Sequence, residues 1–466
     1  MTDLRCDVAI VGGGTAGLAA ERTARAHGAR TLLIDDRFAG TTCADVGCMP
    51  SKLLIAAADA AHAVRKAHVF GVEVPAPNID GVAVMERVRR LRDAFVADAK
   101  ASISTLPVDV PVQARARFLD ATTLVLEDGR KVFAKTIVVA TGSTPAVPQP
   151  FAAVEDRILT NENVFELRDL PRTLAVVGAG PIGIEIGQAM ARLGVETTIV
   201  SEDEKLAGLE DAEVTGALRA SVAGELPLVL GVKLEARPEG EGVRLSWKGQ
   251  SKVFEKVLLA TGRPPNLKGL ALEKAGLDLD DHGTPQFDRH TLRCGSSNVF
   301  LAGDANHDRT VLHEASAEGT IAGRNAATYP DVAPGERAVR FAIVFSDPPV
   351  AILGEPPGDR TVTGRADFGN QGRARVFART GGLANLYADR ATGRLVGATL
   401  AAPGAEHYAH LLAWAIQKGA TASALLDFPF YHPTYEEGLK PALRSICAQV
   451  KAPPARDRDN GFMPGF

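Results

Sequence analysis

Two glycine motifs with identical spacing constrain the fold of this chain more than any other feature. Each places glycines at positions i, i+2 and i+5 after an apolar run: Gly12, Gly14 and Gly17, then Gly178, Gly180 and Gly183. The apolar runs predict buried strands over residues 8–11 and 174–177, each followed by a helix. The first glycine allows a tight turn, the second lets a pyrophosphate approach the backbone, and the third lets helix and strand pack closely. The sequence therefore predicts an α/β fold with two Rossmann-like dinucleotide-binding domains.

The residues that follow the second strand of each fold differ. The stretch "ARTLLID" ends in Asp35, 23 positions after Gly12, where an acid binds a ribose hydroxyl. The equivalent position of the second fold holds Ser201, and Glu202 comes next. An arginine suited to a 2′-phosphate is missing from this "SEDEK" turn, so we expect NAD rather than NADP, with Glu202 as the candidate ribose ligand.

Further phrases extend the internal similarity and set the predicted domains. Each fold is closed by an apolar strand ending in "ATG", at Thr141-Gly142 and at Thr261-Gly262, and a third strand ends in Gly303-Asp304. A hairpin turning at residues 389–394 and an apolar-faced helix closed by Gly419 predict a C-terminal α+β domain. We expect two dinucleotide domains, a segment that completes the first of them, an α+β interface domain and a poorly ordered tail, over residues 1–145, 146–265, 266–335, 336–450 and 451–466.

Composition excludes several classes of function. The 466 residues carry a formal net charge of −4, which gives no reason to expect nucleic acid or an anionic membrane as a partner. The sequence contains no run of about 18 apolar residues, so we expect no membrane-spanning helix. The first residues enter a strand pattern at once and do not resemble a signal peptide. Five cysteines are too few for a disulfide scaffold, so we expect a cytoplasmic protein.

Two of those cysteines stand close together in "FAGTTCADVGCMPSK", and three interpretations are open: a metal site, a structural disulfide or a redox pair. Zinc sites need a second ligand pair, which the isolated Cys6, Cys294 and Cys447 do not supply. A structural staple is disfavoured because so small a loop gains little entropy from closure. Residues five apart on a regular helix lie about 140° apart, so Cys43 and Cys48 can bridge only across irregular backbone. We expect a switchable disulfide.

The local pattern also distinguishes the two sulfurs. Gly47 permits the irregular backbone, and a proline such as Pro50 is tolerated only in the first turn of a helix. The regular helix is therefore expected to begin near Cys48, whose thiolate would be favoured by the helix dipole and by Lys52 one turn on.

With these motifs in order, nearly the whole chain resembles the class I pyridine nucleotide–disulfide oxidoreductases, most of all the dihydrolipoyl dehydrogenase branch. The resemblance rests on the cysteine phrase, both glycine motifs, the "ATG" phrases, Gly303-Asp304 and a C-terminal "HPT" phrase at residues 432–434. It implies FAD in the first fold and NAD in the second. The residues implied at FAD are Gly12, Gly14, Gly17, Asp35, Thr42, Lys52, Thr141, Gly142, Gly303, Asp304 and the backbone at His313; those implied at NAD are Gly178, Gly180, Gly183, Glu202 and Gly262.

The resemblance also assigns the catalytic groups. Cys48 would lie against the flavin, Cys43 would exchange with substrate, and Glu185 would pair with Lys52 beside the flavin ring. His432 and Glu437 match the family's base dyad: imidazole titrates near neutral pH, and the acid fixes its tautomer. In the family this histidine reaches the disulfide of the other subunit, so a homodimer with shared active sites is expected. The other nine histidines are interpreted as surface or packing residues, with His313 as the exception.

The substrate is predicted by elimination within the family. Glutathione-type reductases carry arginines after the second fold, and mercuric reductases and large thioredoxin reductases carry a terminal redox pair; these features are absent here. A protein-bound dihydrolipoyl group, oxidised with NAD⁺, remains. The alternatives are a reductase of another small disulfide, a flavin-bearing interaction subunit with vestigial chemistry, and an NADH oxidase or diaphorase side activity. Three features depart from the family pattern: Thr41, Ser201 and the segment 351–368, which is shorter than its family counterpart and lacks the usual acidic helix. They leave the nucleotide preference and the surface for the lipoyl-bearing partner open.

Overall fold

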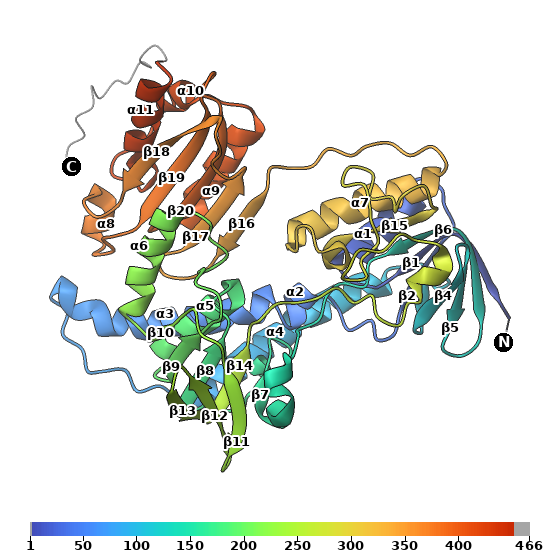
Figure 1. Cartoon of the computed structure of the whole chain (residues 1–466), viewed down its shortest axis with the longest axis horizontal. Helices are drawn as coiled ribbons and strands as arrows, with labels where there is room; N and C mark the ends of the chain where they lie inside the picture. The colour runs from blue at the N-terminus through green and yellow to red at the C-terminus, as the bar shows by residue number, and fades with distance from the viewer. Residues whose placement is uncertain (1, 452–466) are drawn as a thin grey trace. The chain divides into compact units, whose positions relative to one another are not determined.

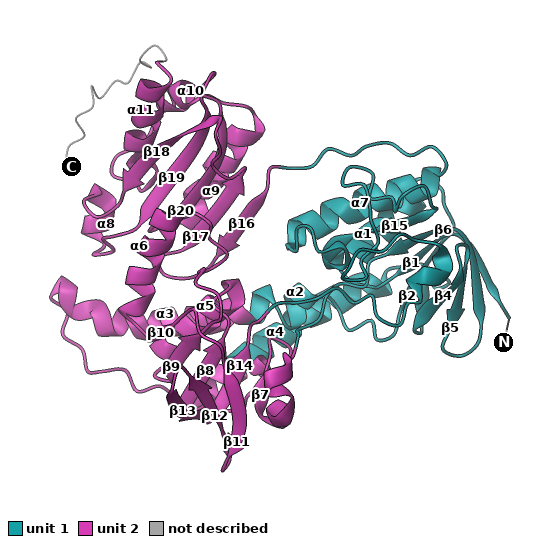
Figure 2. Cartoon of the chain, viewed as in Figure 1, with its two compact units in different colours: residues 1–50, 87–146, 262–338 teal, residues 51–86, 147–261, 339–466 magenta. Residues whose placement is uncertain are grey.

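The computed structural model describes residues 2–451 of the chain in two compact units (Figure 2). Unit 1 comprises residues 1–50, 87–146 and 262–338, and unit 2 comprises residues 51–86, 147–261 and 339–466. Apart from Lys451, the predicted C-terminal tail lies outside the described residues. Helices α3 (Cys48–Lys66) and α4 (Gly81–Ser104) each contribute residues to both units.

Unit 1 is built on a seven-stranded sheet of order β3-β2-β1-β6-β5-β4, in which β15 also pairs with β6 (Figure 1). Strands β3, β2, β1, β6 and β15 run parallel, and β5 and β4 add an antiparallel edge. The strands are β1 (Leu4–Val11), β2 (Thr31–Asp35), β3 (Pro111–Gln113), β4 (Ala116–Asp120), β5 (Thr123–Leu126), β6 (Lys131–Val139) and β15 (Val299–Leu301).

Strand β1, in the interior of this sheet, is buried on both faces, as its unbroken apolar run predicts. Val8 and Ile10 pack in a core with α1 and α7, whereas Ala9 and Val11 belong to a second core on the other face. The helical segments of the unit are α1 (Thr15–Ala26), α2 (Thr42–Asp45), η4 (Leu272–Ala275), η5 (Gly303–Asn306) and α7 (Leu312–Thr328).

The first part of unit 2 repeats the nucleotide-binding architecture. Its parallel sheet has the order β10-β9-β8-β14-β7, and a three-stranded antiparallel sheet, β11-β12-β13, accompanies it. The strands are β7 (Ile158–Leu159), β8 (Thr173–Val177), β9 (Glu196–Val200), β10 (Leu228–Val229), β11 (Glu235–Glu239), β12 (Gly242–Trp247), β13 (Gln250–Phe254) and β14 (Lys256–Leu259). The helical segments are η1 (Ala67–Phe70), η2 (Gln149–Arg157), η3 (Val164–Glu166), α5 (Pro181–Arg192) and α6 (Ala212–Ala223).

The second part of unit 2 is the predicted α+β region. An antiparallel sheet of order β16-β17-β20-β19-β18 packs against α9 and α11 around one apolar core (Figure 1). The strands are β16 (Phe341–Val344), β17 (Val350–Gly354), β18 (Thr361–Asp367), β19 (Leu383–Asp389) and β20 (Leu395–Ala401). The helical segments are α8 (Gly372–Val376), α9 (Ala405–Gln417), α10 (Ala422–Leu426), η6 (Glu436–Leu439) and α11 (Lys440–Gln449). The predicted hairpin is confirmed as β19–β20, and Gly419, with φ +67°, follows the end of α9 as predicted.

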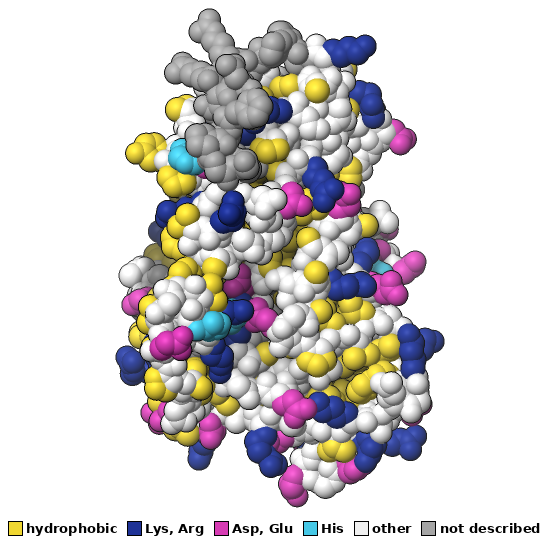
Figure 3. Space-filling view, turned by 90° about the vertical axis from the view of Figure 1, so that its left-hand side faces the viewer, with side chains coloured by type: hydrophobic (Ala, Val, Ile, Leu, Met, Phe, Trp, Pro, Cys, Tyr) yellow, Lys and Arg dark blue, Asp and Glu magenta, His cyan; other side chains and the backbone are white. Residues whose placement is uncertain are grey.

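The surface is mixed in charge. On the face drawn in Figure 3, basic and acidic side chains are interspersed rather than gathered by sign, in keeping with the small net charge. Among residues 2–451, no helix combines the length and apolar character that crossing a bilayer requires.

Candidate active site

The first glycine turn has the geometry that the sequence predicts. Gly12 has φ +110°, and a Cβ at this position would lie 2.3 Å from the carbonyl oxygen of Ala140. A Cβ on Gly17 would lie 1.8 Å from the oxygen of Gly12, so helix α1 packs directly on the turn. At Gly14 an added Cβ would meet no atom within 4 Å. The turn therefore leaves open space at the N-terminus of α1, where a pyrophosphate binds in this type of fold.

The second glycine turn repeats the first almost atom for atom. Gly178 has φ +106°, and its added Cβ would lie 2.4 Å from the oxygen of Ala260. A Cβ on Gly183 would lie 2.0 Å from the oxygen of Gly178, and the position of Gly180 is open. The same motif thus builds the same cradle in both units, which supports two dinucleotide sites in one chain.

The two dinucleotide folds differ at the end of the second strand of each, as the sequence predicts. In the first, the Asp35 carboxylate accepts hydrogen bonds from the backbone N–H of Gly13 at 2.8 Å and of Phe38 at 2.7 Å. In the second, Ser201 is buried and its Oγ accepts from the N–H of Asp203 at 3.2 Å, while Glu202 is exposed. A carboxylate is fixed at the end of β2 only, so the nucleotide preference of the second fold stays a prediction.

The donor set around the first fold fits a bound dinucleotide. The Oγ1 of Thr141 is buried and has no hydrogen-bond partner among the described residues, and an added Cβ at Gly142, where φ is +71°, would meet open space. Asp304, in η5, accepts a hydrogen bond at 2.9 Å from the hydroxyl of Ser143. A buried hydroxyl that lacks a partner is costly, and a cofactor atom would satisfy it.

The remaining residues predicted at the cofactors fall into two groups. Thr42 and His313 are exposed, the former at the start of α2 and the latter in the first turn of α7. Gly262 and Gly303 both have positive φ, of 116° and 70°. Their roles toward FAD and NAD stay predictions.

The cysteine segment has the irregular backbone that a bridge between Cys43 and Cys48 requires. Helix α2 ends at Asp45, Val46 leaves the helical conformation, and α3 begins at Cys48, as predicted. Gly47 is needed at the break because an added Cβ would lie 2.8 Å from the carbonyl oxygen of Thr42. Thr41, the departure from the family pattern, caps α2 by accepting a hydrogen bond from the N–H of Ala44.

Exposure separates the cysteine pair from the other three cysteines. Cys43 is half-buried and Cys48 is exposed, whereas Cys6, Cys294 and Cys447 are buried. Burial raises the pKa of Cys6 and of Cys294 to about 12, so neither forms a thiolate near neutral pH. The accessible thiols are therefore those of Cys43, in α2, and Cys48, at the start of α3, and their role toward a substrate stays a prediction.

The ion pair implied for Lys52 and Glu185 is present. The Nζ of Lys52 donates to Oε2 of Glu185 at 2.8 Å and lies 4.5 Å from the centre of the Phe345 ring. Glu185 is buried, and its other oxygen accepts from the N–H of Phe345 at 2.9 Å. The lysine is thus held in one position by a carboxylate that is itself fixed; its place beside a flavin stays a prediction.

The predicted dyad is also formed. Nδ1 of His432 lies 3.0 and 3.1 Å from the two carboxylate oxygens of Glu437. The Glu437 side chain is only 1% exposed, whereas that of His432 is 47% exposed. Because a carboxylate accepts, Nδ1 is the nitrogen that donates to Glu437, and Nε2 is the nitrogen left to take a proton. The arrangement is that of an oriented general base.

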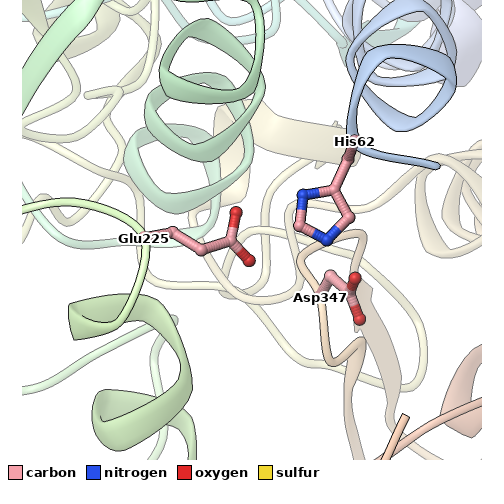
Figure 4. A group of neighbouring side chains, drawn as sticks. All are labelled: His62, Glu225 and Asp347. Carbon is pink, nitrogen blue, oxygen red and sulfur yellow. The ribbon is translucent and has the colours of Figure 1, made fainter. Parts of the chain in front are cut away.

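A second histidine–carboxylate group was not predicted. Atoms of His62, Glu225 and Asp347 that could bind a metal lie within 4.8 Å of one another (Figure 4). The guanidinium of Arg192 donates to Glu225 at 2.7 Å and to Asp347 at 2.7 Å. Burial and the charge of Arg192 lower the pKa of His62, while the two carboxylates act in the opposite direction. A fixed cation thus already lies beside both carboxylates.

Comparisons with known proteins identify the family. Residues 6–319 match the pyridine nucleotide-disulphide oxidoreductase family, and residues 341–443 match the dimerisation domain of that family. Curated relatives include a mercuric reductase of Acidithiobacillus ferrooxidans, 32% identical over 95% of this chain and 83% of its own length. They also include a dihydrolipoyl dehydrogenase of Chlamydia muridarum, 27% identical over 97% of this chain and 99% of its own length.

Solved structures agree in fold. LpdA of Mycobacterium tuberculosis is 26% identical and superposes with a TM-score of 0.81 over 95% of this chain and 99% of its own. The flavoprotein disulfide reductase RclA of Escherichia coli, in its Cu(II) complex, has a TM-score of 0.81 at 21% identity, over 96% of this chain and 100% of its own.

These matches confirm the fold class, and the match to the dimerisation domain supports a homodimer. The relatives include both lipoamide dehydrogenases and mercuric reductases, so they leave the substrate open. The chain belongs to the class I pyridine nucleotide–disulfide oxidoreductases, enzymes that use FAD and NAD(P).

Proposed function

We propose that the chain oxidises protein-bound dihydrolipoyl groups with NAD⁺, as a homodimer with FAD in its first dinucleotide fold. The observation that carries the proposal is the oriented His432–Glu437 pair, in a chain whose two accessible cysteines flank a helix break. A base that can deprotonate a substrate thiol and a sulfur pair that can open are the two groups that dithiol oxidation requires. His432 of one subunit would serve the cysteine pair of the other.

The residues of the chain account for the thiol steps. Nε2 of His432 takes a proton from one substrate thiol, and the thiolate attacks Sγ of Cys43 in the oxidised pair. The Cys43–Cys48 bond breaks, and its electron pair leaves on Sγ of Cys48. The second substrate thiol then attacks the substrate sulfur of the mixed disulfide, and its proton passes to the Sγ of Cys43 that is released. The substrate is left as a cyclic disulfide.

Local structure favours the direction of these steps. Cys48 opens helix α3, so the helix dipole stabilises the leaving thiolate. Glu437 stabilises the imidazolium that forms on His432. Gly12, Gly14, Asp35 and Asp304 would hold FAD, which would supply a two-electron acceptor between the cysteine pair and NAD⁺.

Mercuric ion reduction is the second candidate, because a mercuric reductase is 32% identical to this chain. The base dyad favours dithiol oxidation instead, because the oriented His432 can take a proton from a thiol substrate, whereas Hg(II) carries no proton to remove.

Steady-state assays of the FAD-loaded protein separate the candidates. We expect dihydrolipoamide-dependent reduction of NAD⁺ to exceed both Hg(II)-dependent oxidation of NADPH and the reduction of other small disulfides. Cys43→Ser should abolish the dihydrolipoamide reaction but retain NADH-dependent dye reduction, and Cys294→Ser serves as the buried-thiol control. Faster turnover of Hg(II) or of another disulfide, or equal dihydrolipoamide rates for Cys43→Ser and wild type, would overturn the proposal.

A further inference from the structure

A pocket lies directly beside the base dyad in unit 2. It has a volume of about 440 Å³ and is formed between the α8 segment, through Arg373, Phe377 and Arg379, and residues 433–436. Residues 433–436 are the stretch that separates His432 from Glu437. One wall of the pocket is therefore the stretch that joins His432 to Glu437, although neither of these two residues lines it. The volume of the pocket suits a small ligand or a single side chain.

The two walls of the pocket are held together by one buried side chain. Gln371, which has no exposed surface, accepts a hydrogen bond from the N–H of Ala374 at 2.8 Å and so caps α8. Its amide donates to the carbonyl oxygen of Thr434 at 2.7 Å. The position of the arginines on and after α8 is thus fixed relative to the loop that carries His432.

The pocket carries uncompensated positive charge. Among residues 2–451, no carboxylate lies within ion-pair distance of the guanidinium of Arg373 or of Arg379. Arg373 instead lies 4.3 Å from the centre of the Phe377 ring. Glu436 is the one acid in the lining, so two guanidiniums face one carboxylate. Arginine forks bind carboxylates through paired hydrogen bonds.

A tyrosine adds a neutral donor to the same wall. Burial raises the pKa of Tyr435, with smaller contributions in the same direction from Asp347 and Glu406, and the charges of Arg379 and Arg373 act against that shift. The hydroxyl therefore stays protonated at neutral pH and can donate a hydrogen bond. The pocket thus offers two cations, one neutral donor and the ring of Phe377 for the apolar part of a ligand.

We propose that this pocket is a carboxylate subsite of the active site, which takes an acidic group carried by the dithiol substrate while His432 acts on its thiol. The inference rests on the proposed function and narrows its substrate class. The carboxylate can be the terminal acid of free dihydrolipoate or an acidic residue beside the lipoylated lysine of a carrier. Arg373 and Arg379 are the residues that select it.

Two matched substrate pairs test the subsite in the FAD-loaded protein. Dihydrolipoate and dihydrolipoamide differ only in the terminal charge, and reduced lipoyl-lysine peptides can be made with either Glu or Gln beside the lysine. We expect kcat/KM to favour the acidic member of at least one pair by up to about fivefold, since one partly exposed ion pair contributes up to about 1 kcal/mol. The preference should decline with added salt.

Variants on one short segment provide the controls. Arg379→Gln should remove the preference by lowering kcat/KM for the acidic substrate about fivefold while leaving the neutral one unchanged. Arg375→Gln, at an exposed arginine of α8 outside the pocket lining, should change neither. A preference in the first pair alone identifies a free acid, and one in the second pair alone identifies an acidic carrier; either supports the subsite.

Several results would refute the subsite. They are the absence of any preference, an equal loss for acidic and neutral substrates in Arg379→Gln, an effect of Arg375→Gln as large as that of Arg379→Gln, or loss of the dimer in Arg379→Gln by light scattering. If none of the four substrates is oxidised, the proposed function fails instead. Calorimetric binding of lipoate against lipoamide to wild type and Arg379→Gln then still decides the subsite.

Discussion

Two histidine–carboxylate groups of unit 2, at His432 and at His62, use the same residue types for different roles. His432 is 47% exposed and faces one buried acid, Glu437. His62 is half-buried and faces two acids, Glu225 and Asp347, but both already accept hydrogen bonds from Arg192, whose side chain is 5% exposed. The first histidine has a carboxylate that orients it, and the second shares its carboxylates with a fixed cation.

The partner of the acid, rather than the presence of a histidine, therefore decides what such a group can do. Besides the imidazole of His432, Glu437 accepts from a neutral donor, the backbone N–H of Thr434 at 3.4 Å. A carboxylate that is not neutralised by a guanidinium stabilises an imidazolium, which is what a general base needs. A carboxylate neutralised by a guanidinium stabilises a second cation far less, whether that cation is an imidazolium or a metal ion. We therefore assign catalysis to His432 and a structural role to His62.

The largest effect on the reaction rate is expected when the imidazole of His432 is replaced by a neutral amide. The same substitution at His62 is the comparison. His432→Gln should lower kcat/KM for dihydrolipoamide by about 10²- to 10⁴-fold, the usual contribution of a general base. His62→Gln should stay within about twofold of wild type, since the comparison gives it no chemical role. The steady-state rates of both FAD-loaded variants are measured. Similar losses in the two variants would contradict the assignment of different roles to the two histidines.

Removal of the Arg192 guanidinium should lower the stability of the fold. Arg192→Met leaves Glu225 and Asp347 without their guanidinium, together with Asp59, which Arg192 also contacts at 2.8 Å. Breaking a buried ion pair costs about 3–5 kcal/mol of stability. Because the side chains of Glu225 and Asp347 are 21% and 33% exposed, we expect the free energy of unfolding to fall by about 2 kcal/mol. The urea midpoint of the holoprotein should fall, and by less in Arg192→Lys. An unchanged midpoint would show that Arg192 does not hold the group together.

The acid of the dyad should give a smaller kinetic effect than its histidine. In Glu437→Gln the amide no longer stabilises the imidazolium, and we expect kcat/KM for dihydrolipoamide to fall about tenfold, equal to about 1.4 kcal/mol. Glu437→Asp should recover part of the loss, which a merely structural defect would not show. Glu225→Gln is the matched control from the other group, and a tenfold kinetic loss there would contradict the assignment.

Sequence reasoning found the first group and missed the second for a physical reason. His432 and Glu437 lie five positions apart in one loop, so a local phrase contains both partners. Arg192, Glu225 and Asp347 come from α5, the segment after α6 and the segment after β16, and only the tertiary fold brings them together. The glycine turns and the helix start at Cys48 were predictable because each is fixed by its own few residues.

The same reasoning explains what was missed in the pocket. Arg373 and Arg379 are ordinary exposed residues by pattern, and their relation to His432 depends on Gln371, a buried amide that bridges 63 positions of sequence. Ser201 shows the opposite case, because the sequence alone shows that a serine replaces the acid of the motif. In the structure Ser201 is buried, and its hydroxyl accepts from the backbone where the first fold has a carboxylate.

The smallest expected effect is the pH dependence that His62 gives to stability. Its pKa is lowered first by burial and then by Arg192 and Lys66, against the opposing charges of Glu225 and Asp347. Because the folded pKa lies below the unfolded value of about 6.5, the unfolded state binds the proton more readily. Stability from this group is therefore complete above about pH 6.5 and is lost as the pH falls below it.

The measurement is the difference in thermal midpoint between wild type and His62→Gln across pH 5 to 8. The difference should rise in favour of wild type up to about pH 6.5 and then level off, because glutamine does not titrate in this range. A difference that instead falls as pH rises would mean that the carboxylates outweigh burial and Arg192 at His62. His62 would then stabilise the fold in its charged form, and the contrast with an acid-supported His432 would disappear.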